Sequence, residues 1–318
     1  MPKYNKIFGL SLLATAILLS ACQPREKEAK EVTPPETVQT QPEIAQLKGQ
    51  TEKLNLDIPE CDGKNCPEIS IERLNSNQAF IDQFIDQQIL ARLQGVLNAD
   101  AIAPAKVEVA SEPEADETPA SDAAPKPQLS ARQKLEKQSQ PYMQTFLNLD
   151  KELKDLSANH SISLMIKPKI LNPGAPLATV VLNSTHYLGG AHGSTAQNYY
   201  NFDLDRKKLV KLDDIILPNK KAQLEAKAHE VFKTWVIDSQ LATDIKEYEQ
   251  AWKFKLTDNF FLTRDGLALQ YAEYEIGPYV VGLPRLNIPF SELEGIIKPE
   301  YLPKSEQAAA SEAKANAK

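Results

Sequence analysis

Apolar side chains recur with helical spacing in three parts of the chain. After Ser76 they follow one another at three- and four-residue steps, which predicts an amphipathic helix. The positions are Phe80, Ile81, Phe84, Ile85, Ile89, Leu93 and Val96. A second helix is predicted over about 130–156, with Pro141 as a kink or a restart. A third is predicted over about 221–237, where apolar residues again occupy one face.

Alternating and continuous apolar runs predict strands through most of the remaining folded chain. Their ranges are 68–71, 161–166, 178–183, 198–204, 209–216, 254–256, 260–263, 267–271, 279–281 and 285–288. Arg264-Asp-Gly266 is a turn sequence, so the strands on either side of it form a hairpin. A short helix near 291–297 ends the fold. Helices packed on one side of a mainly antiparallel sheet define the α+β class, here as two consecutive α/β subdomains.

Three segments have a composition that does not support a core. Residues 22–53 and about 99–128 are rich in Pro, Ala and acidic or polar side chains, and 303–318 is a polar tail. Such segments bury too little apolar surface to order themselves. We interpret them as a tether, an acidic insertion and a frayed tail. The two folded subdomains are then expected over 54–183 and 184–302, the first carrying the insertion.

The amino-terminal 22 residues resemble a lipoprotein signal. Lys3 and Lys6 precede an apolar run of signal-peptide length over 7–19. It ends in Leu19-Ser20-Ala21-Cys22, similar to the lipobox at which the signal is cut and the cysteine thiol acylated. Several acyl chains would hold the chain firmly on a membrane. Gln23 follows the cysteine in place of Asp, which favours the outer membrane, with the protein facing the periplasm.

The two other cysteines, Cys61 and Cys66, flank Asp-Gly-Lys-Asn, a turn-forming sequence. In an oxidising periplasm this spacing predicts a small-loop disulfide. A metal site would need more thiols or nearby histidines. The formal net charge of −7 argues against nucleic acid as a partner but is compatible with a cationic protein. After the signal, no apolar stretch is long enough to cross a membrane.

Candidate chemistry gathers around Tyr187-Leu-Gly-Gly-Ala-His-Gly193. Gly189, Gly190 and Gly193 permit positive φ in a tight connection, and His192 is expected to hydrogen-bond the backbone there. Two alternatives use nearby residues. His186 and His192 with Asp203 and Asp205 could bind a metal, but without helical i, i+4 spacing. Ser184, His186 and Asp203 could form a hydrolase triad, but no nucleophile elbow surrounds the serine. We favour the structural role, with no catalytic residue, metal or cofactor.

Tyrosines are concentrated in the second half of the chain. They are Tyr187, Tyr199, Tyr200, Tyr271, Tyr274 and Tyr279. Tyrosines of this kind pack sheets, and they also stack on sugars or anchor protein interfaces. Glu273 and Glu275 flank Tyr274 in the loop over 272–278, which we expect to be exposed. Paired carboxylates can catalyse glycoside hydrolysis, but a solvated acidic edge that meets a cationic protein is the simpler interpretation.

The Tyr-x-Gly-Gly-Ala-His-Gly motif, Asn201-Phe-Asp-Leu-Asp205 and Leu267-Ala-Leu-Gln-Tyr-Ala-Glu-Tyr-Glu-Ile-Gly-Pro-Tyr279 together resemble the extracellular domain of RsiV-type proteins. The opening over 68–97 is similar to the small domain that precedes it in the PdaC group. The resemblance covers about 61–302 apart from the insertion. In the two better-known settings of that family, the domain is the outer part of a lysozyme-binding anti-sigma factor or sits beside a peptidoglycan deacetylase. We expect neither activity to carry over, because no cytoplasmic segment remains and no deacetylase domain follows.

The resemblance implies recognition of a lysozyme-like protein or of peptidoglycan. We therefore expect a non-enzymatic, lipid-anchored binding protein of the cell envelope. The candidate binding residues are Tyr187, His192, Glu273, Tyr274, Glu275 and Tyr279. The alternatives are a cell-wall hydrolase or deacetylase accessory enzyme and a structural subunit of an envelope assembly. The oligomeric state stays open.

Overall fold

The computed structural model describes residues 45–61, 63, 65–97, 129–156 and 161–303, all within one unit of the chain, Ile44–Lys318. The predicted signal, Cys22, most of the tether, the acidic insertion and the tail from 304 lie outside these residues. The predicted disulfide is confirmed: Cys61 and Cys66 are joined, with their Cα atoms 5.8 Å apart. In the part of the chain that the structure describes, no helix combines the length and hydropathy needed to span a bilayer.

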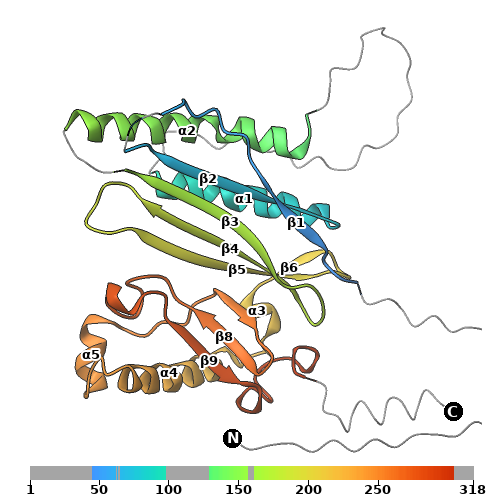
Figure 1. The fold of residues 1–318 in the computed structure, drawn as a ribbon. Coiled ribbons are helices and arrows are strands. Elements are labelled where there is room, and N and C mark those ends of the chain that lie inside the picture. Colours follow the sequence, from blue (N-terminus) through green and yellow to red (C-terminus); the bar gives the residue numbers. More distant parts are fainter. Residues whose placement is uncertain (1–44, 62, 64, 98–128, 157–160, 304–318) are drawn as a thin grey trace, which may run out of the picture. The chain divides into compact units, whose positions relative to one another are not determined.

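The larger sheet has six strands arranged in the order of the sequence (Figure 1). They are β1 (Gly49–Lys53), β2 (Glu68–Ser76), β3 (Ser163–Asn172), β4 (Ala178–Tyr187), β5 (Ser194–Asp203) and β6 (Lys208–Val210). β2 and β3 run parallel, and every other neighbouring pair in this sheet is antiparallel. The sheet is therefore mainly antiparallel, as predicted.

Two helices cover one face of this sheet (Figure 1). α1 (Ala79–Val96) and α2 (Ala131–Asp155) lie between β2 and β3 in the chain, and so belong to the long crossover that a parallel pair requires. α1 buries the apolar stripe expected from the sequence, including Ile81, Ile85, Ile89 and Leu93. α2 begins with a capping box between Ser130 and Gln133 and continues through Pro141.

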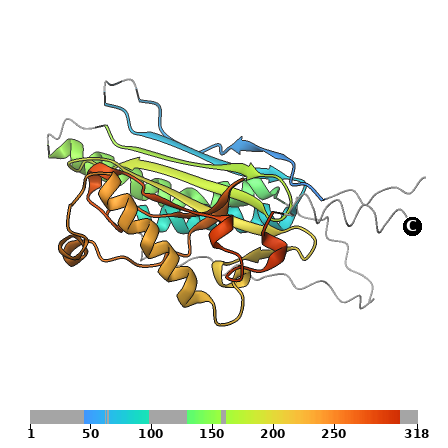
Figure 2. The same cartoon turned by 90° about the horizontal axis from the view of Figure 1, so that it is seen from below.

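The smaller sheet contains β7 (Phe260–Leu262), β8 (Gly266–Gln270) and β9 (Arg285–Pro289), all antiparallel. α4 (Lys221–Asp238) packs on its outer face and buries Leu224 and Phe232 in a second core. Figure 2 shows α4 crossing these strands. The short helices α3 (Leu212–Ile215) and α5 (Ile245–Ala251) precede and follow α4. The α+β class is confirmed, with helices on one side of each sheet.

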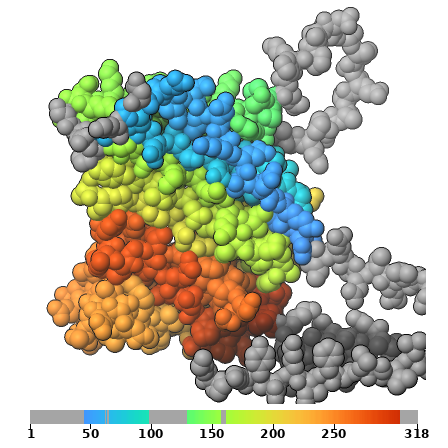
Figure 3. Space-filling view, viewed as in Figure 1, coloured from blue at the N-terminus to red at the C-terminus, as the bar shows by residue number. Residues whose placement is uncertain are grey.

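The inner faces of the two sheets contact each other. Val181 of β4 and Tyr199 of β5 form a small buried cluster with Phe261 of β7 and Ala268 of β8. The rings of Tyr199 and Phe261 stack 4.2 Å apart, and the Arg285 guanidinium lies over both. Figure 3 shows the orange and red C-terminal residues packed directly against the yellow-green strands.

Side chains from the C-terminal region complete the free edge of β5. β6 pairs only with 201–203 of this strand. In the middle of β5, the Asn259 side chain accepts a hydrogen bond from Tyr199 N and donates one to Gln197 O, both at 2.8 Å. Nearer its start, a Glu273 carboxylate oxygen accepts a hydrogen bond from Thr195 N at 2.9 Å. These three hydrogen bonds satisfy backbone groups that a missing neighbouring strand would otherwise bond.

Gly49–Lys53, predicted to lie in the tether, instead form β1. Leu47 and Leu54 on either side of the strand are buried, and this brief apolar signal was outweighed by the polar composition around it. The predicted subdomain boundary after 183 falls within β4.

Three predicted strands in the second half also need correction. In the range 209–216 only the first residues extend β6. Lys211 N then donates to the Asp214 carboxylate, which begins α3. Residues 254–256 pair in neither sheet, and 279–281 form a 3-10 turn. This turn lies between Pro278, whose ring fixes φ, and Gly282, which has a φ of 66°. α5 was not predicted.

Candidate functional site

The loop after β8 is fixed at its base and exposed at its tip. Ile276 is fully buried, and its carbonyl accepts a hydrogen bond from the Tyr248 hydroxyl at 3.0 Å. Gly277 lies so close to this hydroxyl that a Cβ there would be 2.9 Å from it. Tyr274, by contrast, is 50% exposed and has a φ of 63°, in the left-handed region that favours glycine. The loop therefore holds an aromatic ring at the surface in a sparsely populated conformation.

The turn between β4 and β5 uses its glycines in different ways. Gly189 has a φ of 88°, as predicted for a tight connection. Gly193 does not have a positive φ, but a Cβ there would lie 2.9 Å from His186 O, so only glycine permits this close backbone approach. Gly190 shows neither feature, so of the three glycines that could adopt a positive φ only Gly189 does so.

His192 connects this turn to the loop after β8. Its Nδ1 lies 2.9 Å from Gly193 O and its Nε2 lies 3.0 Å from the Tyr274 hydroxyl. Because a carbonyl only accepts, Nδ1 carries the proton, and in the neutral ring Nε2 accepts from Tyr274. The ring also stacks on Tyr279 at 3.8 Å, and the Tyr279 hydroxyl donates to Gly193 O. The backbone hydrogen bond predicted for His192 is present.

Trp252, which follows α5, extends this group of rings. Its ring lies 6.5 Å from that of Tyr274 with an interplanar angle of 24°, and Tyr274 lies 5.6 Å from Tyr279 at 29°. We call Trp252, Tyr274, Tyr279 and His192 the aromatic cluster. Sequence reasoning missed Trp252, since α5 was not predicted. Tyr187 ends β4 opposite Ser163 of β3 rather than in the aromatic cluster.

The two candidate carboxylates support the loop rather than forming a free acidic edge. Glu273 is partly buried and bonds Thr195 N of β5. Glu275 is exposed, and its carboxylate accepts a hydrogen bond from Ala272 N at 2.8 Å. The expectation of two solvated glutamates is therefore wrong for Glu273, because the unpaired edge of β5 provides it with a backbone donor.

Several polar side chains lie between α1 and the larger sheet, near the end of β4. Arg92 of α1 donates from Nε to the Ser184 hydroxyl at 2.7 Å, and Glu273 acts electrostatically on Arg92 and on His186. Burial lowers the pKa of the Arg92 guanidinium, and burial followed by the Arg92 charge lowers the pKa of His186. Tyr200 donates to the Gln88 side chain, and burial raises the pKa of Tyr200 to about 12.

The predicted alternatives are not assembled by this geometry. Ser184 is 2% exposed and bonded to Arg92, and it pairs in register with Ala196. Asp203 lies seven residues farther along β5, where its carboxylate bonds Arg206. No triad of Ser184, His186 and Asp203 is formed. Within the described ranges, no three His, Cys, Asp or Glu side chains gather as metal ligands.

Comparison with known proteins finds similarity over part of the chain. Residues 213–291 match the family model "Protein of unknown function (DUF3298)". The chain is 28% identical over 162 residues to peptidoglycan-N-acetylmuramic acid deacetylase PdaC of Bacillus subtilis (strain 168), covering 49% of this chain and 34% of the relative. It thus spans about a third of that protein's length.

A crystal structure of a DUF3298 family protein from Pseudomonas aeruginosa PAO1 has a similar fold. It aligns with a TM-score of 0.55 and 22% identity over 83% of this chain and 98% of that one. The matched region 213–291 contains α4, the smaller sheet and the loop that carries Tyr274 and Tyr279. Residues 213–291 thus match the DUF3298 family, and the similarity to PdaC confirms the resemblance to PdaC-type proteins that the sequence motifs indicate.

Proposed function

We propose that this chain is a cell-envelope protein that binds the glycan strands of peptidoglycan through the aromatic cluster. Acylation of Cys22 holds it on the outer membrane, facing the periplasm. The relationship to PdaC, whose name describes a peptidoglycan-N-acetylmuramic acid deacetylase, supports an envelope setting. The chain itself acts as a binding protein rather than as an enzyme.

The observation that carries this proposal is the set of near-parallel rings at one surface. Neighbouring rings of the aromatic cluster are inclined to each other by 23–34°, and Tyr274 is half exposed. Exposed aromatic faces bind the apolar faces of sugar rings. The hydrogen bonds of His192 and Tyr279 to Gly193 O hold these rings in place before a ligand arrives. A preorganised surface loses less conformational freedom on binding.

A cationic lysozyme-like protein is the second candidate, favoured by the formal net charge of −7. The hydrogen bonds that Glu273 and Glu275 make within the fold weaken the case for this cationic partner. These carboxylates are partly committed to backbone donors. Glycan is therefore the leading target. A cell-wall enzyme and a structural envelope subunit are the remaining alternatives.

Binding to isolated sacculi and to soluble glycan oligomers tests the proposal. The protein is the mature chain with Cys22→Ser, which removes the acylation site. Isothermal titration should detect the oligomers, and Tyr274→Ala or Trp252→Ala should weaken binding about two- to tenfold, the loss expected for one aromatic contact. Val280→Ala is the matched control, since Val280 is 85% exposed near the same loop but outside the aromatic cluster.

Failure to bind sacculi or oligomers would remove the glycan proposal. Salt-sensitive binding to lysozyme in the same assay would then identify the protein target instead. Deacetylation or cleavage of the oligomers during the incubation would refute the non-enzymatic role.

A further inference from the structure

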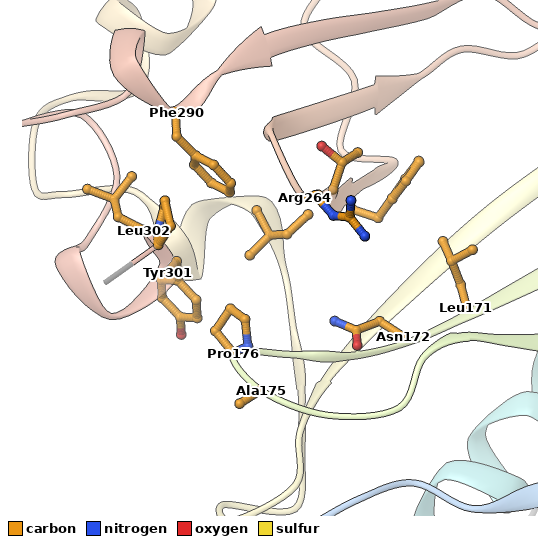
Figure 4. A pocket seen from close by; sticks show the side chains of 12 residues that line it. Leu171, Asn172, Ala175, Pro176, Arg264, Phe290, Tyr301 and Leu302 are labelled. Carbon is orange, nitrogen blue, oxygen red and sulfur yellow. The ribbon is translucent and has the colours of Figure 1, made fainter. Parts of the chain in front are cut away.

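A second surface feature lies at the opposite end of β4 from the aromatic cluster. The turn between β3 and β4, the hairpin of β7 and β8, and the segment after β9 enclose an open pocket of 580 Å³. Its walls are mostly apolar and include Leu171, Pro176, Phe290 and Leu302, which surround the cavity in Figure 4. The volume lies within the range of small-molecule sites, roughly 300–1,000 Å³. Leu171 is 43% exposed, so part of this apolar wall contacts solvent.

Two uncharged polar side chains of the pocket, those of Asn172 and Thr263, are bonded within local turns. Asn172 donates to Leu177 O at 2.9 Å and accepts from Gly174 N at 3.3 Å. The Thr263 hydroxyl lies within hydrogen-bond distance of Gly266 O and of two backbone amides of its own turn. These side chains therefore have little capacity left for a polar ligand.

Arg264 is the one charged residue that lines the pocket among the described residues. Its guanidinium makes no hydrogen bond or ion pair with any residue in the described ranges, and Figure 4 shows it directed toward the cavity. The turn itself is held by Thr263 and Gly266, so the fold does not require an arginine side chain here. The pocket thus combines an apolar interior with one uncompensated positive charge.

We propose that this pocket binds an amphiphile with a hydrocarbon body and one anionic headgroup, of the fatty-acid class. The hydrocarbon lies against the apolar walls, and the carboxylate pairs with Arg264. A peptide fits less well, because its backbone amides would find Asn172 and Thr263 already bonded and would lose hydration without replacement. This inference is independent of glycan binding, which uses the other end of β4.

Titration of the mature chain, carrying Cys22→Ser, with three probes that share a ten-carbon chain tests the proposal. The two ionic probes are kept below their micelle concentrations and decanol below its solubility limit. Decanoate should bind, decanol should bind more weakly, and decyltrimethylammonium should bind least. Arg264→Gln should lower the affinity for decanoate about fivefold, the upper range for one partly exposed charge pair. Lys137→Gln, which removes an exposed charge on α2 outside the pocket, should not change it.

Leu171→Ser tests the apolar walls of the pocket. It should lower the affinity for decanoate and for decanol to the same extent. Equal affinities of decanoate for the parent protein and for Arg264→Gln would overturn the proposal, as would equal affinities for all three headgroups. A short apolar peptide with a free carboxylate that binds where decanoate does not would replace the fatty-acid class with a peptide terminus. Circular dichroism of each variant separates loss of binding from loss of folding.

Discussion

Glu273 offers a sharp test of how the recognition loop is attached to the larger sheet. Its carboxylate accepts a hydrogen bond from Thr195 N at the free edge of β5, and it lies near the charge of Arg92. Glu273→Ala leaves that amide without its partner and removes an anion from the surroundings of the guanidinium. Both effects destabilise the folded state.

The expected size follows from the exposure of the pair. A hydrogen bond to a charged group contributes about 1.5–3 kcal/mol. Glu273 is only partly buried, so the free energy of unfolding should fall by about 1–2 kcal/mol after allowance for solvent screening. For a folded unit of this size the midpoint should fall by about 2–8 °C. Glu273→Lys should be more severe, because it places a second cation near Arg92.

Urea and thermal unfolding, followed by circular dichroism, measure this loss. Glu273→Gln keeps an acceptor oxygen and should retain much of the stability. Glu275→Ala is the matched control, because that exposed side chain bonds only within its own loop, and its effect should stay within about 0.5 kcal/mol. If Glu273→Ala and Glu275→Ala have equal effects on stability, the reasoning about the sheet edge is wrong.

Three other properties can be tested independently. Gly266→Ala should lower the free energy of unfolding by about 2–4 kcal/mol, because the new Cβ would lie 2.1 Å from Ile288 O and force two strands apart. Gly190→Ala is the control in the same denaturation assay and should fold normally, because the nearest atom to its Cβ would lie 3.9 Å away. The pKa of His186 is lower in the folded chain than in the unfolded chain, so as the pH falls the unfolded chain protonates this side chain at a higher pH. The free energy of unfolding should therefore fall as the pH drops below 6.5, the ordinary pKa of histidine. His186→Gln should flatten that pH dependence in urea titrations. Cys22→Ala should abolish palmitate labelling, and persistent label would contradict the predicted lipid anchor.

The elements that the sequence predicts well are those with long, regular periodicity. α1 and α4 follow their apolar stripes closely, and the hairpin at Arg264-Asp-Gly266 follows its turn residues. β1 was missed because a five-residue polar strand with two flanking leucines has almost no periodic signal. Its position depends on pairing with β2, which is a tertiary contact.

The candidate site was predicted in part for a related reason. The sequence motifs brought attention to His192, Tyr274 and Tyr279, and the structure places these three side chains in contact. Trp252 carries no motif, and only the path of the chain after α5 brings it beside Tyr274. Glu273 appears solvated when its neighbours in sequence are considered alone, because the amide it bonds lies 78 positions away.

Because side chains from the C-terminal region complete the edge of β5, the larger sheet cannot be prepared as a fragment without them. The matched family segment begins at 213, just after β6, which suggests a natural place to cut the chain. A fragment ending there would lose Asn259 and Glu273, and so would present bare amides and carbonyls along β5. It would also uncover Val181 and Tyr199. Such a fragment should add strands from other copies and aggregate, so the limit of sequence similarity is not a limit at which this protein can be separated.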